Sequence, residues 1–149
     1  MTADRETLAQ YRIERARETL AEAELMAEAG HWNACVNRLY YACFYAVNAI
    51  LIRQGVTVSK HTAVRSALNR QLVARGLVTR ELGRLYNDLF DSRQRGDYVD
   101  LLRFEEAQVQ PWIGKTHEFL GRIEELLEQP RLSGSDQEQA GGSSSDQGR

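Results

Sequence analysis

Residues 31–55 read HWNACVNRLYYACFYAVNAILIRQG, and this stretch decides the fold. It contains no proline, and its apolar residues recur with helical periodicity. At roughly 100° per residue, one helix face collects apolar side chains: Trp32, Val36, Leu39, Tyr40, Cys43, Val47 and Ile50. The stretch therefore predicts a core helix over about residues 31–54 that ends at Gly55.

The opposite face of this predicted helix is mixed rather than purely apolar or purely polar. It carries Asn37, Arg38, Tyr41, Tyr45 and Asn48. An aromatic and polar face is expected of a cleft or of a surface that contacts a partner. The alternative is that the tyrosines pack in the bundle with their hydroxyls at its rim.

Helical periodicity continues on both sides of this stretch, and no segment alternates apolar and polar residues as a half-buried strand does. Ser59 and Thr79 are plausible N-caps, and Pro111 should kink the last helix or start its main portion. The further helices are predicted over about residues 3–29, 59–76, 79–95 and 101–128. The fold class is therefore all-α, with a helical domain over residues 1–129 and a disordered polar tail over residues 130–149.

Length and charge limit the function. The chain has 149 residues, enough for one domain, and a formal net charge of -2. This charge predicts no general attraction to nucleic acid or anionic membrane, so RNA contact requires a local basic patch. Asn48 and Arg53 interrupt the longest apolar run, so no membrane span is predicted. The first residues lack the apolar core of a signal peptide, which favours a cytoplasmic location.

The two cysteines indicate packing rather than chemistry. Cys35 and Cys43 share the predicted core helix and lie two turns apart, roughly 12 Å along its axis, too far for a disulfide. We expect both to be buried thiols in a reducing compartment. His31 and Cys35 have a spacing that can hold zinc, but no second ligand pair accompanies them, so no metal site is predicted.

Arg93 departs from its surroundings. The predicted fourth helix has an apolar stripe of Leu82, Leu85, Tyr86 and Leu89, and Arg93 occupies its next position. An arginine there snorkels, pairs with a carboxylate or binds an anion. We expect Gly96 to end the helix and bring Asp97 and Tyr98 close to Arg93, where Asp97 would orient the guanidinium. The alternative is a structural staple between Arg93 and Asp97.

The remaining histidines are weaker candidates. His61 follows a predicted helix start and is most simply a surface or capping-region residue. His117 stands between polar residues of the last helix and is expected to be exposed. The chain has no glycine-rich phosphate loop and no Ser-His-Asp arrangement that stands out.

Three blocks resemble a bacterial and archaeal branch of the HEPN domains, the nucleotide-binding domains of higher eukaryotes and prokaryotes. They are NRLYYACFYAVNAILIRQG at 37–55, SKHTAVRSAL at 59–68 and LYNDLFDSRQRGDYVD at 85–100, and the similarity extends over about residues 5–128. The resemblance implies an up-and-down bundle of four or five helices that forms a homodimer. Many HEPN proteins are metal-independent ribonucleases of toxin–antitoxin or defence systems, with an Arg-x(4-6)-His motif at the dimer cleft. Others are partners of a nucleotidyltransferase that adds AMP to a tyrosine near the motif.

Mapped onto this chain, the motif arginine is Arg93, but no histidine follows it at the family spacing, and Gln94 stands next to it. Arginine stabilises a phosphorane but is a poor base, so Asp97 and Tyr98 are the expected assisting groups. Residues expected to contact the substrate are Arg38, Tyr41 and Arg95. No cofactor is expected.

Three hypotheses follow from these patterns. The first is an RNA-binding HEPN toxin with weak metal-independent cleavage at Arg93. The second is a non-catalytic partner of a nucleotidyltransferase or an antitoxin protein, with Tyr98 as nucleotide acceptor. The third is a purely structural helical dimer.

Overall fold

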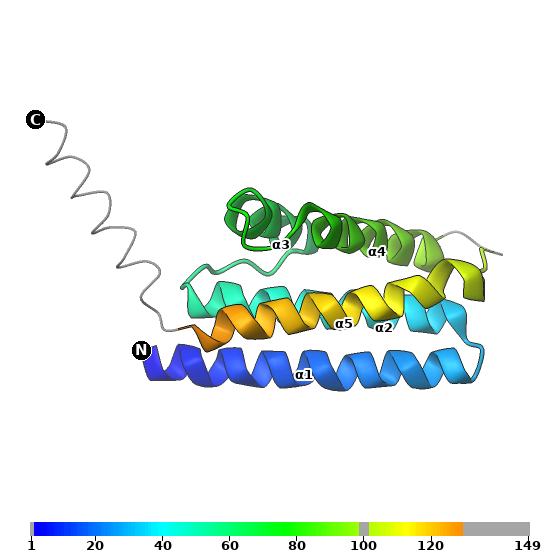
Figure 1. The fold of residues 1–149 in the computed structure, drawn as a ribbon, viewed down its shortest axis with the longest axis horizontal. Helices are drawn as coiled ribbons and strands as arrows, with labels where there is room; N and C mark the ends of the chain where they lie inside the picture. The colour runs from blue at the N-terminus through cyan, green and yellow to red at the C-terminus, as the bar shows by residue number, and fades with distance from the viewer. Residues whose placement is uncertain (1, 99–101, 130–149) are drawn as a thin grey trace, which may run out of the picture.

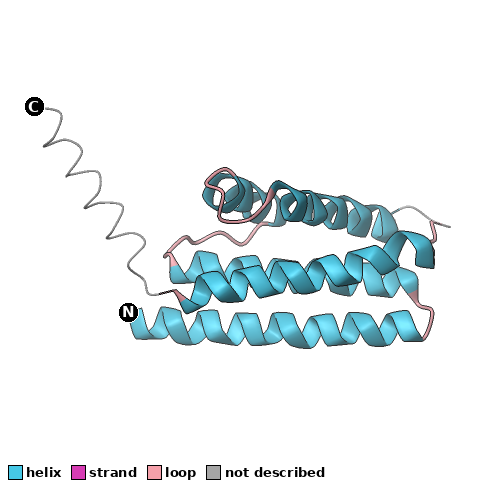
Figure 2. Ribbon diagram, in the orientation of Figure 1, coloured by secondary structure: helices cyan, strands magenta, loops and turns pink. Residues whose placement is uncertain are grey.

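The computed structural model describes residues 2–98 and 102–129, and every regular element in these residues is a helix (Figure 2). The predicted all-α fold is confirmed. The elements in chain order are α1 (Thr2–Glu28), α2 (Trp32–Arg53), α3 (His61–Leu68), the π-helical segment η1 (Asn69–Val73), α4 (Arg80–Tyr98) and α5 (Glu106–Glu128).

The long helices run up and down. In Figure 1, α1 and α2 form an antiparallel pair, α5 lies beside both, and α3 and α4 lie on the far side from α1. Helix α2 is the central element, since it contacts α1, α3, α4 and α5. One side of α2 therefore faces α1 and α5, and another side faces α3 and α4.

The apolar face predicted for the central helix is buried. Val36, Leu39, Tyr40, Cys43 and Val47 are all at most 1% exposed. Each fully buried aliphatic side chain contributes about 2 kcal/mol of hydrophobic stabilisation. In α1 the facing stripe consists of three alanines, an isoleucine and a leucine, and the alanines allow close helix packing: Ala9, Ile13, Ala16, Leu20 and Ala23.

One sequence prediction about α2 needs correction. By length and composition alone this helix could cross a membrane, despite Asn48 and Arg53. Of the 18 residues in its most apolar segment, 67% are buried inside the bundle, which is typical of a core helix of a folded domain. The two polar residues are themselves only 8% exposed each, so they do not interrupt the buried surface.

Most of these predicted helix boundaries are confirmed, and the start of the third helix is wrong. Gly30, Gly55 and Gly76 adopt left-handed φ values of 76°, 80° and 75° in the turns that end α1, α2 and η1, as predicted. The third helix begins at His61, with Lys60 rather than Ser59 at the N-cap position. Thr79 does cap α4, because its Oγ1 accepts a hydrogen bond of 3.2 Å from the backbone N–H of Leu82.

The prediction that Gly96 ends the fourth helix is also wrong, since α4 continues to Tyr98. The ring of Phe104 packs against the Gly96 backbone, and a Cβ there would lie 3.2 Å from Phe104 Cε2. Helix α5 then starts at Glu106, not near residue 101, because Glu105 and Gln108 form a capping box. Pro111 lies inside this helix.

Candidate functional site

Arg93 lies on α4 and turns its guanidinium toward the aromatic side of α2. Its Cζ is 5.0 Å from the ring centroid of Tyr40 and 5.6 Å from that of Tyr41. Both distances fall in the range of cation–π contacts, in which the face of an aromatic ring attracts a cation. The arginine therefore takes a leucine position of the α4 stripe, and α2 supplies two rings that suit a cation there.

His61 was predicted to be a surface or capping-region residue. It does begin α3, but its side chain is half-buried rather than on the surface, and its contacts were not predicted. Its ring stacks on Phe44 with centroids 4.5 Å apart and an interplanar angle of 13°. It also contacts the rings of Tyr40 and Tyr41, at 5.7 and 5.8 Å. Arg93 and His61 thus lie against the same two tyrosine rings, although they are 32 positions apart in the sequence.

We call Arg93, His61, Tyr40, Tyr41 and Phe44 the Arg93 cluster. Within it, the Tyr40 hydroxyl and His61 Nδ1 are 2.7 Å apart and share one hydrogen bond. Burial lowers the pKa of His61, and the positive charge of Arg93 lowers it further. The imidazole is therefore neutral near pH 7 and can accept a proton.

The phenols beneath His61 stay protonated. Burial raises the pKa of Tyr40 to about 12, although the Tyr86 hydroxyl and Arg93 act in the opposite direction. Burial also raises the pKa of Tyr86 well above its ordinary value. Tyr40 is consequently a hydrogen-bonding support for His61 rather than a base itself. When Nδ1–H donates to the Tyr40 oxygen, the lone pair of Nε2 is left available.

Asp97 and Tyr98, the residues predicted to assist Arg93, lie in the last turn of α4. Their side chains are outside the part of the chain that the structure describes. The predicted Arg93–Asp97 staple and the role of Tyr98 as nucleotide acceptor therefore stay predictions. Arg95, also predicted to contact substrate, is an exposed residue of the same helix.

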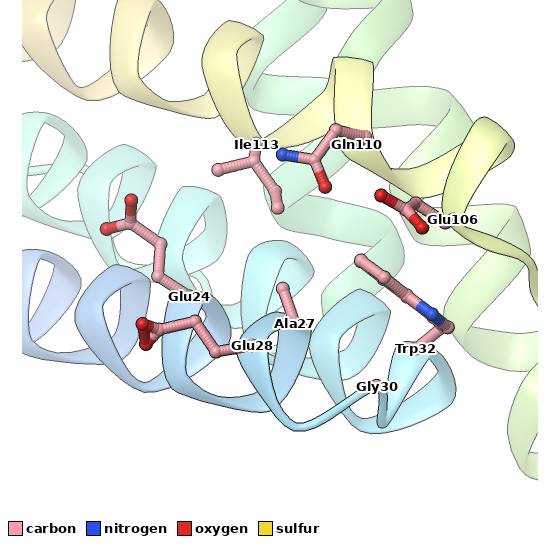
Figure 3. Close-up of a pocket in the computed structure, with 8 residues that line it drawn as sticks. All are labelled: Glu24, Ala27, Glu28, Gly30, Trp32, Glu106, Gln110 and Ile113. Atoms are coloured by element: carbon pink, nitrogen blue, oxygen red, sulfur yellow. The ribbon is translucent and has the colours of Figure 1, made fainter.

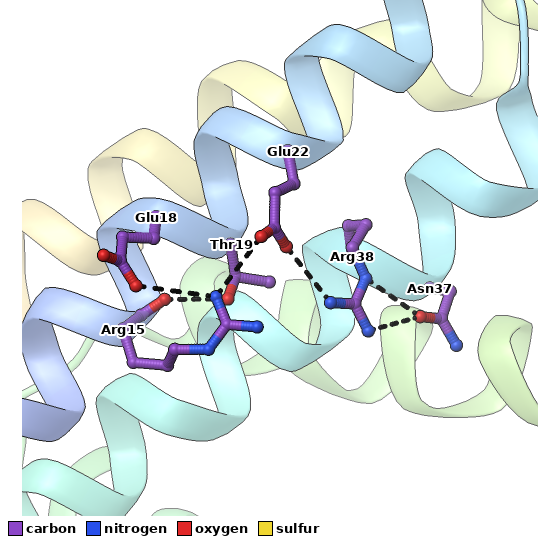
Figure 4. Close-up of polar contacts among 6 residues, drawn as sticks. All are labelled: Arg15, Glu18, Thr19, Glu22, Asn37 and Arg38. Atoms are coloured by element: carbon purple, nitrogen blue, oxygen red, sulfur yellow. Dashed lines mark hydrogen bonds and ion pairs between the residues drawn. The ribbon is translucent and has the colours of Figure 1, made fainter.

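The predicted contact residues Arg38 and Tyr41 do lie together. Arg38 Cζ is 5.4 Å from the Tyr41 ring centroid, so Tyr41 links Arg38 to Arg93. Arg38 is already engaged, because its Nη1 donates to Glu22 at 3.2 Å and its Nη2 to Asn37 at 2.9 Å (Figure 4). Glu22 also pairs with Arg15, at 3.4 Å. This network holds Arg38 in place beside the cluster.

Arg65 is a second cation that the sequence did not single out. It lies on α3, with its Cζ 4.1 Å from the ring centroid of Phe90, and it pairs with Asp91 at 3.6 Å. The signal for both Arg65 and His61 was present as helical spacing, i and i+4 on α3. This spacing could not be interpreted from the sequence, because it does not show that the first turn of α3 packs against α2.

The cysteines and remaining histidines have structural surroundings. Cys35 and Cys43 are buried free thiols, as predicted, and burial raises the pKa of Cys35 to about 11. His117 is exposed, as predicted, and lies 3.2 Å from Glu24. Within residues 2–98 and 102–129, no group of three or more acidic, histidine or cysteine side chains is arranged to hold a metal ion.

Two hollows lie at opposite ends of the α1–α2 pair. The acidic hollow, about 560 Å³, is lined by eight residues that include Glu24, Glu28 and Glu106 (Figure 3). The basic hollow, about 420 Å³, has Arg5 and Arg12 among its lining residues. Its other walls are Leu8, Phe44, Asn48, Ile52, Gly55, Val56, Thr57, Val58 and Ser59.

Fold and site together define an up-and-down helical bundle with an arginine, a histidine and aromatic rings gathered between its second, third and fourth helices. Comparison with known proteins identifies the family to which such a bundle belongs. The HEPN domain profile matches residues 9–126. The chain is 44% identical over 125 residues to a "UPF0332 protein" of Thermotoga maritima, covering 84% of this chain and 95% of the relative.

This chain therefore belongs to the HEPN domain family. Two more distant relatives from Methanocaldococcus jannaschii carry functional names. "Putative toxin MJ0142" is 25% identical over 77% of this chain and 78% of its own length. "Putative toxin MJ0605" is 28% identical over 78% of this chain and 87% of its own length.

Proposed function

We propose that this HEPN protein is a toxin that binds an RNA phosphate at Arg93 and cleaves the strand slowly without a metal ion, with His61 as the proton-transfer group. One observation carries the proposal: the Arg93 guanidinium and the His61 imidazole contact the same two rings. The names of the relatives from Methanocaldococcus jannaschii support a toxin-type role.

The residues divide the chemistry between them. The guanidinium of Arg93 stabilises the charge that develops on the phosphate oxygens. His61 Nε2 takes the proton of the 2'-hydroxyl, the 2'-oxygen bonds to phosphorus, and the bond from phosphorus to the 5'-oxygen breaks. The imidazolium then returns that proton to the departing 5'-oxygen. Tyr40 holds the imidazole in the productive orientation through the 2.7 Å hydrogen bond.

The histidine missing after Arg93 in the sequence is thus replaced, in this proposal, by one from another helix. A neutral imidazole near pH 7 is a far better base than a guanidinium, whose pKa exceeds 12. The lowered pKa of His61 keeps the imidazole neutral and available as a base near pH 7, but it makes that base intrinsically weaker, which is consistent with slow cleavage.

The proposal includes a homodimer. Tyr45 on α2 is a half-buried aromatic side chain whose ring contacts that of Tyr41, a half-buried member of the Arg93 cluster. A second copy packed along the edge of this face would bring two such clusters to one cleft that an RNA strand can enter. Light scattering of the purified chain should give twice the mass of one copy. A monomeric mass at micromolar concentration would contradict this part of the proposal.

The test of function compares two histidines. Purified protein in excess EDTA is incubated with labelled single-stranded RNA, and the products are resolved on a gel. His61→Gln and Arg93→Ala should each lower the cleavage rate at least a hundredfold, whereas His117→Gln, an exposed histidine on α5, should leave it unchanged. Equal rates for wild type, His61→Gln and Arg93→Ala would show that the cutting is background and that the proposal is wrong.

A further inference from the structure

The basic hollow has the composition of an anion site. Arg5 and Arg12 are its charged lining residues, and none of the described residues that line it is a carboxylate. Asn48, Thr57 and Ser59 add amide and hydroxyl groups to its wall. Guanidinium and hydroxyl donors without a competing carboxylate are the groups that bind phosphate oxygens.

The fold accounts for one of these arginines better than for the other. The Arg12 Nε is buried and has no hydrogen-bond partner among the described residues, a state that costs stability in an isolated protein. Arg5 lies in the first turns of α1, but its guanidinium rests against Gly55 at the carboxyl end of α2, where the helix dipole favours a cation. A Cβ on Gly55 would lie 2.9 Å from Arg5 Nη1. A bound anion would satisfy the Arg12 Nε, with the Arg5 guanidinium as a second donor.

The hollow is continuous with the Arg93 cluster. Phe44 belongs to both, since its ring stacks on His61 and also lines the hollow. From Tyr41 in the cluster to Asn48 in the hollow, α2 advances seven residues, roughly 10 Å along its axis. One face of α2 thus connects a cation at Arg93 to the arginine pair, with aromatic rings between them.

We infer that Arg5 and Arg12 form a second phosphate-binding site, which takes another phosphate of the same RNA strand whose scissile phosphate lies at Arg93. This inference rests on the proposed function, because Arg93 supplies the first phosphate position. Aromatic rings between two cationic positions suit a single strand, whose bases stack on rings while its phosphates meet arginines. A ligand with only one phosphodiester would reach one of the two positions.

The test measures binding of strands that cannot be cut. Oligouridylates with 2'-O-methyl groups lack the attacking hydroxyl, and their affinity is followed by fluorescence anisotropy for a twelve-nucleotide strand and by NMR titration for a dinucleotide. The proteins are full-length wild type, the double variant Arg5→Gln/Arg12→Gln, Arg93→Ala and the control Arg84→Gln. Arg84 is an exposed arginine of α4 outside the lining of the hollow.

The double variant should bind the twelve-nucleotide strand about tenfold more weakly and the dinucleotide within twofold of wild type. The logarithmic slope of its affinity against salt should become shallower by about 0.7 for each phosphate that the variant no longer neutralises. Arg93→Ala should weaken both ligands, and Arg84→Gln should change neither more than twofold. This pattern would support both the second site and the first.

Two other patterns overturn the inference. If the double variant behaves like Arg84→Gln with both ligands while Arg93→Ala still weakens binding, the second site is wrong and the proposed function stands. If the double variant loses the dinucleotide as strongly as the long strand, the hollow is not an extension of the Arg93 site. If Arg93→Ala binds both ligands like wild type, the proposed function itself fails.

Discussion

The acidic and basic hollows lie at the two ends of one helix pair and carry opposite charge. At the Gly30 end, Glu24, Glu28 and Glu106 surround the space, while at the Gly55 end Arg5 and Arg12 do so. The formal net charge of -2 conceals this separation, because it sums over the whole chain. The basic hollow is therefore a local basic surface on a chain whose net charge predicts no general attraction to RNA.

Helix dipoles account for only part of the difference. Glu106 lies in the first turn of α5, where a carboxylate is stabilised. At the other end, Arg53 closes α2 and donates to the carbonyls of Leu126, Leu127 and Gln129, the unpaired end of α5. Glu106 and Arg53 thus serve the fold, whereas Arg5 and Arg12 are the cations that we infer to bind a phosphate.

Removing the structural cation of the basic end should have the largest effect. Arg53→Met deletes the charged donors to three carbonyls and should lower the free energy of unfolding by about 3 kcal/mol. Urea denaturation followed by circular dichroism measures the change. Arg84→Met, on the exposed surface of α4, is the control and should stay within about 0.5 kcal/mol of wild type. Equal stability of both variants would mean that Arg53 is not a structural cap.

Reversing the charges of each hollow in turn should affect RNA affinity at the basic hollow far more than at the acidic hollow. Arg5→Glu with Arg12→Glu should weaken binding of the twelve-nucleotide strand about thirtyfold, equivalent to about 2 kcal/mol. Glu24→Lys with Glu28→Lys makes the mirrored change at the acidic end and should alter affinity less than threefold. Anisotropy titration at fixed salt gives both values. Equal effects at the two ends would indicate a response to net charge rather than to the site.

A third change acts between the two ends, where Arg17 on α1 pairs with Glu124 on α5. The Arg17 Nε–Glu124 Oε2 distance is 2.9 Å, and a second bond completes the pair. Arg17→Gln should cost about 1 kcal/mol at pH 7, because both side chains are partly exposed. The hydrogen bond from Arg17 holds the pKa of Glu124 below its ordinary value.

The pH dependence of this pair has a definite sign. A lowered carboxyl pKa contributes stability above the ordinary value of 4.5, and that stability is lost as pH falls through the folded-state value. Wild type should therefore lose more stability than Arg17→Gln when pH is lowered from 5 to 3, as measured by denaturation at each pH. Parallel curves would show that the pair does not form in solution.

The smallest effect is expected at His61, beside the basic hollow. Its pKa is lowered in the folded state, so the unfolded chain binds the proton more readily. Stability should fall as pH decreases below the ordinary value of 6.5, by under about 1 kcal/mol because the ring is partly exposed. Thermal denaturation between pH 7.5 and 5 should show this loss in wild type, and His61→Gln should lack it.

The fold was readable from the sequence because it rests on local periodicity. The stripe from Val36 to Ile50 and the glycines at 30 and 55 specify the central helix without knowledge of its neighbours. The misplaced boundaries depended on side-chain contacts that helical periodicity does not encode. Helix α4 continues through Gly96, against which the Phe104 ring packs, and α5 starts late because Glu105 and Gln108 form a capping box.

Only part of the candidate site could be predicted from the sequence. Arg93 was visible as a cation in an apolar stripe, and Tyr41 and Arg38 as polar residues on the second face of α2. His61 was missed because nothing near it in sequence reveals the Tyr40 hydroxyl and the Phe44 ring that hold it. The family spacing directs attention to the few positions after Arg93, whereas the structure brings His61 in from α3.

The composition of α2 also has a consequence for biosynthesis. A long apolar helix that is exposed on a nascent chain favours aggregation until other helices cover it. Helix α1 precedes it in the chain and forms its most extensive contact. The partner that shields α2 therefore leaves the ribosome first, so the hairpin can form during translation while α4 and α5 are still being made.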